Sequence, residues 1–120
     1  MQRRVSWNDC DTSGRIRFQA AFDWFADAEV EFLRDRGVAS LFGTLPRVAA
    51  NASYSEALRF DDLVTIEVTV AEIGRSSLRY EFVVSKDGEE AVRGNVTAVH
   101  VVDDRAAPLP QSLRTALGSA

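Results

Sequence analysis

AAFDWFADAEVEFLRDR, residues 20–36, is a stretch in which apolar side chains recur at helical spacing. One face of the helix that it predicts collects Phe22, Phe25, Glu29, Phe32, Leu33 and Arg36, while Ala21, Trp24, Ala28 and Val30 widen the apolar surface beyond that face. A helix that lies on a protein surface has a narrower apolar stripe. We therefore expect a helix from about Ala20 to Arg36 that other elements wrap, with Gly37 as its C-cap residue.

The apolar period changes to two after this helix, and that period is typical of strands. Four strands are predicted around residues 48–54, 64–70, 78–84 and 91–102. The segment Lys86-Asp87-Gly88-Glu89 between the last two carries an Asp-Gly hairpin signal. Val5 and Trp7 alternate with polar neighbours and predict a short opening strand, and a short helix is expected at residues 111–117.

The predicted order is strand, long helix, then four strands, and it indicates an α+β fold in one domain of residues 1–120. Short connections make the strands antiparallel. A long, nearly all-apolar helix needs a curved sheet of about five strands around it, which is the architecture called the hotdog fold. A monomer of this size would leave its sheet edges open, and open edges pair readily. We therefore expect a homodimer formed through an edge strand, or a homotetramer.

Composition narrows the class of partner. The formal net charge is −4, which argues against nucleic-acid binding, because nucleic-acid binders carry basic patches. The 13 Arg residues outnumber the single Lys86, a bias that a G- and C-rich genome also produces. Cys10 is the only cysteine, so no intrachain disulfide can form. No signal peptide or membrane helix is recognised, and we expect a cytoplasmic protein that does not bind membranes.

Several kinds of chemistry are disfavoured by what the sequence contains. With His100 as the only histidine and Cys10 as the only thiol, a structural zinc site of the usual kind is excluded. There is no phosphate-binding glycine loop and no Gly-x-Ser-x-Gly motif. We interpret His100 as a strand histidine that faces the sheet or an interface, and Cys10 as a small buried apolar residue. Carboxylate chemistry remains.

Asp9 and Asp11 stand in a turn between the opening strand and the helix, where aspartates also serve as simple turn caps. The helix that follows this turn begins without a capping side chain, because no Ser, Thr, Asp or Asn occupies the N-cap region from Arg17 to Ala21. The free N–H groups and positive dipole of such a start suit a carbonyl oxygen that becomes negative. A nearby carboxylate then acts on the carbonyl carbon, or on a water beside it, without a metal.

The segment from Val5 to Phe18, VSWNDCDTSGRIRF, resembles the opening motif of the 4-hydroxybenzoyl-CoA thioesterase family. That motif has an aromatic residue, then Asp-x-Asp, then a glycine, then a hydrophobic run into the central helix. The resemblance continues along nearly the whole chain, at Trp24-Phe25, Glu31-Phe32-Leu33-Arg34, Gly37, Leu58-Arg59-Phe60-Asp61-Asp62, Glu72-Ile73-Gly74-Arg75-Ser76-Ser77 and Pro108-Leu109-Pro110.

The resemblance implies a catalytic role for Asp11, as nucleophile or general base in the hydrolysis of an acyl thioester. It implies that a backbone N–H of Phe18, with Gln19 beside it, polarises the thioester carbonyl. It assigns Arg75, Ser76 and Ser77 to CoA binding, although they also fit an exposed strand connection. No cofactor is implied, since the CoA thioester is the substrate. The His or Pro-Asn pair of many relatives is replaced here by Gln19-Ala20-Ala21, which predicts a more apolar pocket mouth.

Alternatives remain open at this stage. The acyl group is undetermined, and the substrate is either an acyl-CoA or an acyl group on a carrier protein; a non-catalytic acyl-CoA-binding domain is a third possibility. Some hotdog enzymes place the carboxylate on the helix, where Asp27 and Glu31 are the candidates, although both also fit a solvated helix edge. Glu29 has no cation within one turn of its own helix, so its partner must come from the sheet or from another subunit.

Overall fold

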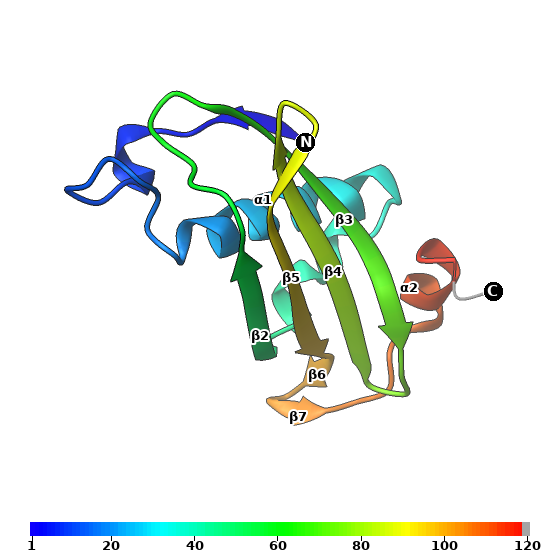
Figure 1. Ribbon diagram of the computed structural model, residues 1–120. Helices are drawn as coiled ribbons and strands as arrows, with labels where there is room; N and C mark the ends of the chain where they lie inside the picture. Colours follow the sequence, from blue (N-terminus) through cyan, green and yellow to red (C-terminus); the bar gives the residue numbers. More distant parts are fainter. Residues whose placement is uncertain (119–120) are drawn as a thin grey trace.

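The computed structural model describes residues 1–118 and consists of a curved antiparallel sheet with one long helix on its concave face (Figure 1). The helix is α1 (Ala20–Asp35). The five-stranded sheet has the order β1-β3-β4-β5-β2, with β1 (Gln2–Arg4), β2 (Arg47–Tyr54), β3 (Leu63–Ile73), β4 (Ser77–Lys86) and β5 (Glu89–Val99). This is the hotdog fold, and the predicted fold class is confirmed.

Helix α1 follows the prediction to within one residue at its end. It stops in a Schellman motif, in which the Val38 N–H donates to the Leu33 carbonyl and the Gly37 N–H donates to the Arg34 carbonyl, both at 3.0 Å. Gly37 has φ 76°, a conformation that an L side chain rarely adopts and glycine adopts freely. Arg36 is the C-cap residue, and Gly37 takes the left-handed position directly after it, so the predicted glycine ends the helix from one position beyond the C-cap.

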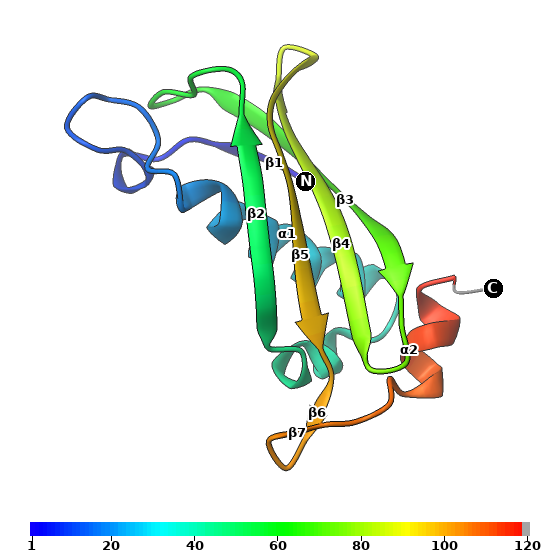
Figure 2. The same ribbon diagram turned by 60° about the horizontal axis from the view of Figure 1, so that its bottom comes forward.

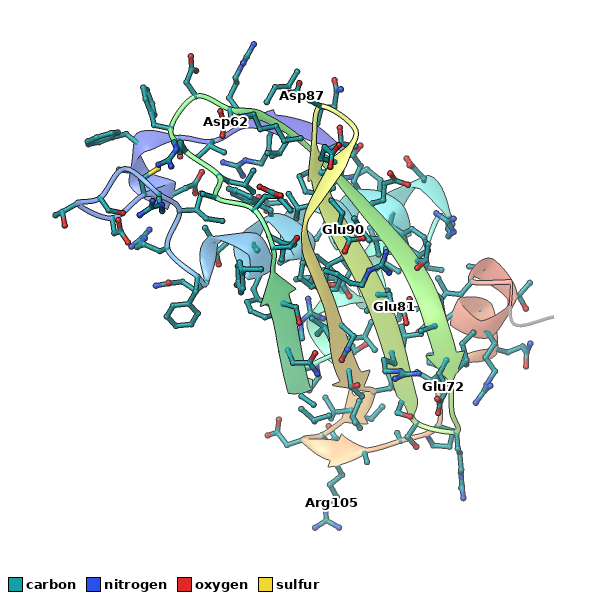
Figure 3. The ribbon with its side chains drawn as sticks, in the orientation of Figure 1. Asp62, Glu72, Glu81, Asp87, Glu90 and Arg105 are labelled. Carbon is teal, nitrogen blue, oxygen red and sulfur yellow. The ribbon has the colours of Figure 1, made fainter. Side chains whose placement is uncertain are left out.

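The core lies between α1 and the concave face of the sheet. Phe25 of α1 packs against Tyr80 and Phe82 of β4, with ring centroids 5.4 and 5.1 Å apart. Gly94 of β5 makes room for this layer, because a Cβ built there would stand 2.5 Å from the Phe82 ring. The opposite face of the sheet is polar, and Figure 3 shows Glu72, Glu81 and Glu90 along it. The sheet thus buries only one face, as expected of an α+β fold.

The first strand is displaced from its predicted position. Strand β1 ends at Arg4, and Trp7 begins a 3-10 turn, η1 (Trp7–Asp9), with its side chain 65% exposed. Alternation of Val5 and Trp7 suggested a longer strand. The reason for the difference is a reciprocal capping box between Ser6 and Asp9, which bends the chain into the turn before Trp7 can join the sheet.

The last predicted strand is divided in two. Strand β5 ends at Val99, and β6 (Val101–Val102) leaves the sheet to form a hairpin with β7 (Arg105–Ala106). Asp103 and Asp104 make its turn with φ of 52° and 62°, which aspartate tolerates better than most residues. A 3-10 helix η2 (Ala39–Thr44) joins α1 to β2, and α2 (Gln111–Ala116) follows the hairpin.

Strand β2 forms one edge of the sheet, and seven of its eight residues are exposed. Figure 2 shows that the two ends of β2 lie near different parts of the molecule: the strand ends on the side of the blue loop before α1 and starts on the side of β6 and β7. Within residues 1–118, no helix combines the length and the hydropathy needed to cross a membrane.

Candidate active site

Asp11 lies at the start of an exposed loop, where Ser13 fixes its carboxylate. The Asp11 Oδ1 atom accepts hydrogen bonds from the Ser13 Oγ at 2.5 Å and from the Ser13 N–H at 2.8 Å. These two bonds, with the charge of Arg15, hold the pKa of the Asp11 carboxyl below its usual value. The carboxylate is therefore ionised at neutral pH and open to solvent, as a nucleophile or general base requires.

The loop returns to the helix start through a short antiparallel ladder. The Asp11 N–H donates to the Arg15 carbonyl at 2.9 Å, and Cys10 and Ile16 form a β-bridge. The Arg17 N–H donates to the Asp9 carbonyl at 2.8 Å. The loop between Asp9 and Arg17 thus has its two ends hydrogen-bonded to each other, directly before Phe18.

The start of α1 offers unused N–H donors, as its lack of an N-cap residue predicted. The N-cap position is held by Gln19, whose side chain makes no capping hydrogen bond. The Ala20 N–H donates to the Arg17 carbonyl, whereas the N–H groups of Phe18 and Gln19 have no hydrogen-bond partner within the described part of the chain. Asp11 thus lies within the segment that the Asp9–Arg17 hydrogen bond closes, and Phe18 and Gln19 follow directly after this segment.

A pocket of about 390 Å³ opens beside Phe18, whereas Asp11 and Gln19 are not among the residues that line it. Its walls come from the helix lead-in and from the end of β2 with the segment after it: Arg15, Ile16, Phe18, Tyr54, Ser55, Glu56, Ala57 and Leu58. The Tyr54 hydroxyl donates to the Phe18 carbonyl and so fixes the peptide group to which the Gln19 N–H belongs. Sequence reasoning missed Tyr54 as a site residue, because this contact joins residues 36 positions apart.

Arg75, Ser76 and Ser77 are not brought to this pocket within one chain. Arg75 and Ser76 lie in the turn between β3 and β4, and Ser77 begins β4. This turn lies at the opposite end of the sheet from the Asp11 loop (Figures 1 and 2). Backbone bonds hold the turn against the C-terminal segment: the His100 N–H donates to the Ser76 carbonyl, and the Leu109 N–H donates to the Arg75 carbonyl. The Arg75 side chain itself is exposed.

The other candidate residues, His100, Cys10, Asp27 and Glu31, are described by their burial and contacts. His100 is buried, with its Nδ1 atom 3.4 Å from the Ala107 carbonyl oxygen. Cys10 is half-buried, and burial, followed by the charges of Asp9 and Asp11, raises the pKa of its thiol. Asp27 pairs with Arg3, and Glu31 lies on the exposed side of α1.

Among residues 1–118, no three side chains of the His, Cys, Asp and Glu types gather in a metal-binding group. The carboxylate of Glu29 is fully buried and pairs with Arg47 of β2. Of the two sources expected for the partner of Glu29, the sheet or another subunit, the sheet supplies it.

Comparisons with known proteins identify the family and agree with the fold. A family model described as the thioesterase-like superfamily matches residues 5–117. The 4-hydroxybenzoyl-CoA thioesterase of Pseudomonas sp. (strain CBS-3) is 30% identical over 95 residues, which are 72% of this chain and 67% of that protein.

Two solved structures are similar over most of their length. A gentisyl-coenzyme A thioesterase is 25% identical with a TM-score of 0.89, covering 98% of each chain. A thioesterase from Thermus thermophilus, solved with coenzyme A and Zn, is 26% identical with a TM-score of 0.88, covering 98% of this chain and 92% of that one. Because the family match spans nearly the whole sequence and the fold agrees, this protein belongs to the thioesterase-like superfamily.

Proposed function

We propose that this protein hydrolyses an acyl-CoA thioester to the free acid and CoA. The observation that carries the proposal is the pairing of an ionised, accessible Asp11 carboxylate with an uncapped helix start beside a pocket. The thioester carbonyl would lie with its oxygen toward the N–H of Phe18 or Gln19. These donors and the helix dipole stabilise the negative charge that develops on that oxygen.

Two routes are chemically balanced at this site. On the nucleophilic route, an Asp11 oxygen bonds to the carbonyl carbon, the C–S bond breaks, the CoA thiolate takes up a proton, and water then hydrolyses the acyl anhydride. On the general-base route, Asp11 accepts a proton from a water whose oxygen attacks the carbonyl carbon, and that proton passes to the departing sulfur. Neither route uses a cofactor.

The names of the relatives support CoA esters as the substrate class. The similar proteins are named for 4-hydroxybenzoyl-CoA and gentisyl-coenzyme A, and the thioesterase of Thermus thermophilus was solved with coenzyme A. We therefore place CoA esters before carrier-protein esters, and the 4-hydroxybenzoyl and gentisyl esters at the head of a substrate panel. Aliphatic esters complete the panel, because the pocket is open and a second copy would alter its depth.

We also propose that the working unit contains two copies joined through β2. This strand has no edge proline, and only its first residue, Arg47, is charged; its exposed apolar residues include Val48 and Tyr54. An unprotected edge of this kind is a template for strand pairing. Tyr54 also lines the pocket, so a second copy on this edge would add to the pocket walls.

The test is release of free thiol over the panel, with Asp11→Asn beside the wild-type protein. We expect wild-type turnover of at least one CoA ester and a kcat lower by about two orders of magnitude or more in Asp11→Asn, with the fold intact by circular dichroism. A variant with near-normal kcat would rule out the role of Asp11. Tight CoA-ester binding without any wild-type turnover would favour the non-catalytic alternative.

A further inference from the structure

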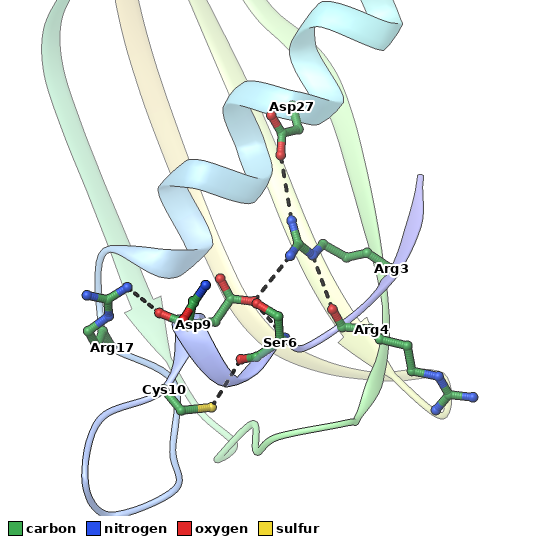
Figure 4. Close-up of polar contacts among 8 residues, drawn as sticks. Arg3, Arg4, Ser6, Asp9, Cys10, Arg17 and Asp27 are labelled. Atoms are coloured by element: carbon green, nitrogen blue, oxygen red, sulfur yellow. Dashed lines mark hydrogen bonds and ion pairs between the residues drawn. The ribbon is translucent and has the colours of Figure 1, made fainter.

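Asp9, the first aspartate of the Asp-x-Asp pair, is bonded more fully than Asp11. Its Oδ2 atom accepts hydrogen bonds from the Ser6 N–H at 2.8 Å, the Ser6 Oγ at 2.9 Å and the Arg3 Nη2 at 3.2 Å (Figure 4). Its side chain is 14% exposed, whereas Asp11 is exposed. A carboxylate with this many donors and so little access to solvent is suited to holding structure, not to attacking a substrate.

Arg3 connects Asp9 to the central helix. Its Nη1 atom stands 3.6 Å from the Asp27 Oδ2, and its guanidinium lies 5.4 Å from the centre of the Trp24 ring. Trp24 is fully buried in the core, so the Arg3 guanidinium rests beside a well-packed ring. The chain of contacts from Asp9 through Arg3 to Trp24 and Asp27 therefore ties the η1 turn to the middle of α1, as Figure 4 shows for Arg3, Asp9 and Asp27.

The backbone of Asp9 holds the other side of the loop. Its carbonyl accepts the Arg17 N–H at 2.8 Å, and Arg17 directly precedes Phe18. The loop of residues 9–17 is thus closed by the backbone of Asp9. The side chain of Asp9, through Arg3, attaches the same loop to α1. If its carboxylate is lost, the turn that carries Asp11 can move relative to the N–H groups at the helix start.

We propose that Asp9, through Arg3, is a positioning residue that sets the distance between the Asp11 carboxylate and the N–H donors of Phe18 and Gln19. This inference rests on the proposed thioesterase function. Displacement of a catalytic group by about 1 Å can cost about 10²-fold in rate. Asp9 itself does not touch the substrate, so its loss lowers kcat and leaves the affinity for the CoA ester nearly unchanged.

The experiment compares Asp9→Asn, Arg3→Gln and the double variant with the wild-type protein on its best CoA ester. Each single variant is expected to lower kcat by about 10- to 100-fold with KM within about twofold. The double variant should be no slower than the slower single variant, because the two side chains act as one unit. The reduction should be the same across the plateau of the pH–rate profile, since the ionisation that limits the rate belongs to Asp11.

Two matched controls separate positioning from general loss of stability. Glu90→Gln breaks another Arg–carboxylate pair, the more exposed one with Arg93 on the polar face of the sheet, and should leave kcat unchanged. Val38→Ala removes buried core volume just beyond the C-terminal end of α1, the helix end opposite to Phe18 and Gln19, and should lower the unfolding temperature without lowering kcat of the folded enzyme. A Val38→Ala kcat as low as that of Asp9→Asn would overturn the proposal.

A second readout does not depend on turnover. Amide hydrogen exchange at residues 10–19 should be faster in Asp9→Asn than in the wild-type protein and unchanged in Glu90→Gln. Unchanged exchange in Asp9→Asn, or unchanged kcat, would overturn the positioning role. Faster exchange in Asp9→Asn, when the wild-type protein hydrolyses no thioester, would instead leave the loop architecture correct and reject the proposed function.

Discussion

At the scale of single residues, the chemistry that we propose for Asp11 depends on how its carboxylate is kept charged while remaining exposed. Burial next to a cation would hold the charge but would also block the approach of a substrate. The loop instead uses two short-range donors from Ser13, of which the hydroxyl has the larger effect on the Asp11 pKa. The carboxylate keeps its second oxygen, Oδ2, available for chemistry, because both bonds from Ser13 end on Oδ1.

If Asp11 is the catalytic carboxylate, we expect the Ser13 hydroxyl to set the acid limb of the pH–rate profile. A group whose pKa is depressed is ionised, and thus active, above that pKa, and activity is lost as the pH falls through it. Ser13→Ala removes the largest interaction that lowers the Asp11 pKa, so the acid limb of kcat/KM should move to higher pH while the plateau changes little. Thr12→Ala, in the same loop, is the control, since the Thr12 side chain makes no hydrogen bond within residues 1–118 and its loss should leave the limb in place. An unshifted limb in Ser13→Ala would show that another ionisation limits the rate.

At the scale of elements, α1 is held to the edge strand by a buried charge pair. Glu29 of α1 is fully buried and accepts two hydrogen bonds from Arg47 of β2, one of them at 3.1 Å. The Arg47 guanidinium lies near the rings of Phe25 and Phe42, at 5.6 and 5.2 Å. Burial, followed by the Glu29 charge, raises the pKa of the neighbouring Tyr80 hydroxyl, which stays protonated.

Removing one member of this pair should cost more stability than removing both. Arg47→Met leaves the Glu29 carboxylate buried without a cation, and we expect a loss of about 3 kcal/mol in the free energy of unfolding, at the lower end for buried pairs because Arg47 is partly exposed. The double variant Glu29→Leu/Arg47→Met should recover most of this loss, since apolar residues of similar volume replace a buried pair at little cost. Urea denaturation measures both variants. If the double variant were less stable than Arg47→Met, removing the buried Glu29 charge would bring no gain, and the pair would carry no net desolvation cost.

The elements also show what the sequence could and could not predict. Helix α1 and strands β2 to β5 were predictable because each has a clear apolar period. The family resemblance, now confirmed, supplied the candidate site residues, which periodicity alone does not identify. The η1 turn was missed because the capping box between Ser6 and Asp9 competes with a β pattern that is only two residues long. The Glu29–Arg47 pair could not be assigned because it joins residues that are 18 positions apart across a packed interface.

At the scale of the whole molecule, the residues predicted for catalysis and for CoA binding lie at opposite ends of one sheet (Figure 2). A closed dimer about a two-fold axis pairs the same strand of both copies in opposite directions. Pairing through β2 would therefore place the Gly74–Ser77 end of one copy beside the Asp11 end of the other. Each complete site would then take Asp11, Phe18 and Gln19 from one copy and Arg75 from its partner.

This arrangement predicts that two defective variants restore each other. Alone, Asp11→Asn should be nearly inactive, and Arg75→Gln should raise KM for a CoA ester by about tenfold, the loss of one charge-assisted contact. Random reassembly of the two variants makes half of the dimers mixed, and in each of these one site keeps both Asp11 and Arg75 while the other lacks both. At low substrate concentration, the mixture should therefore regain about a quarter of the wild-type rate from intact sites.

Native mass spectrometry with differently tagged subunits verifies that mixed dimers of the 13.2 kDa chain have formed. Verified mixed dimers without this gain would mean that Asp11 and Arg75 do not meet in one site, and a single 13.2 kDa species would reject the dimer through β2 itself.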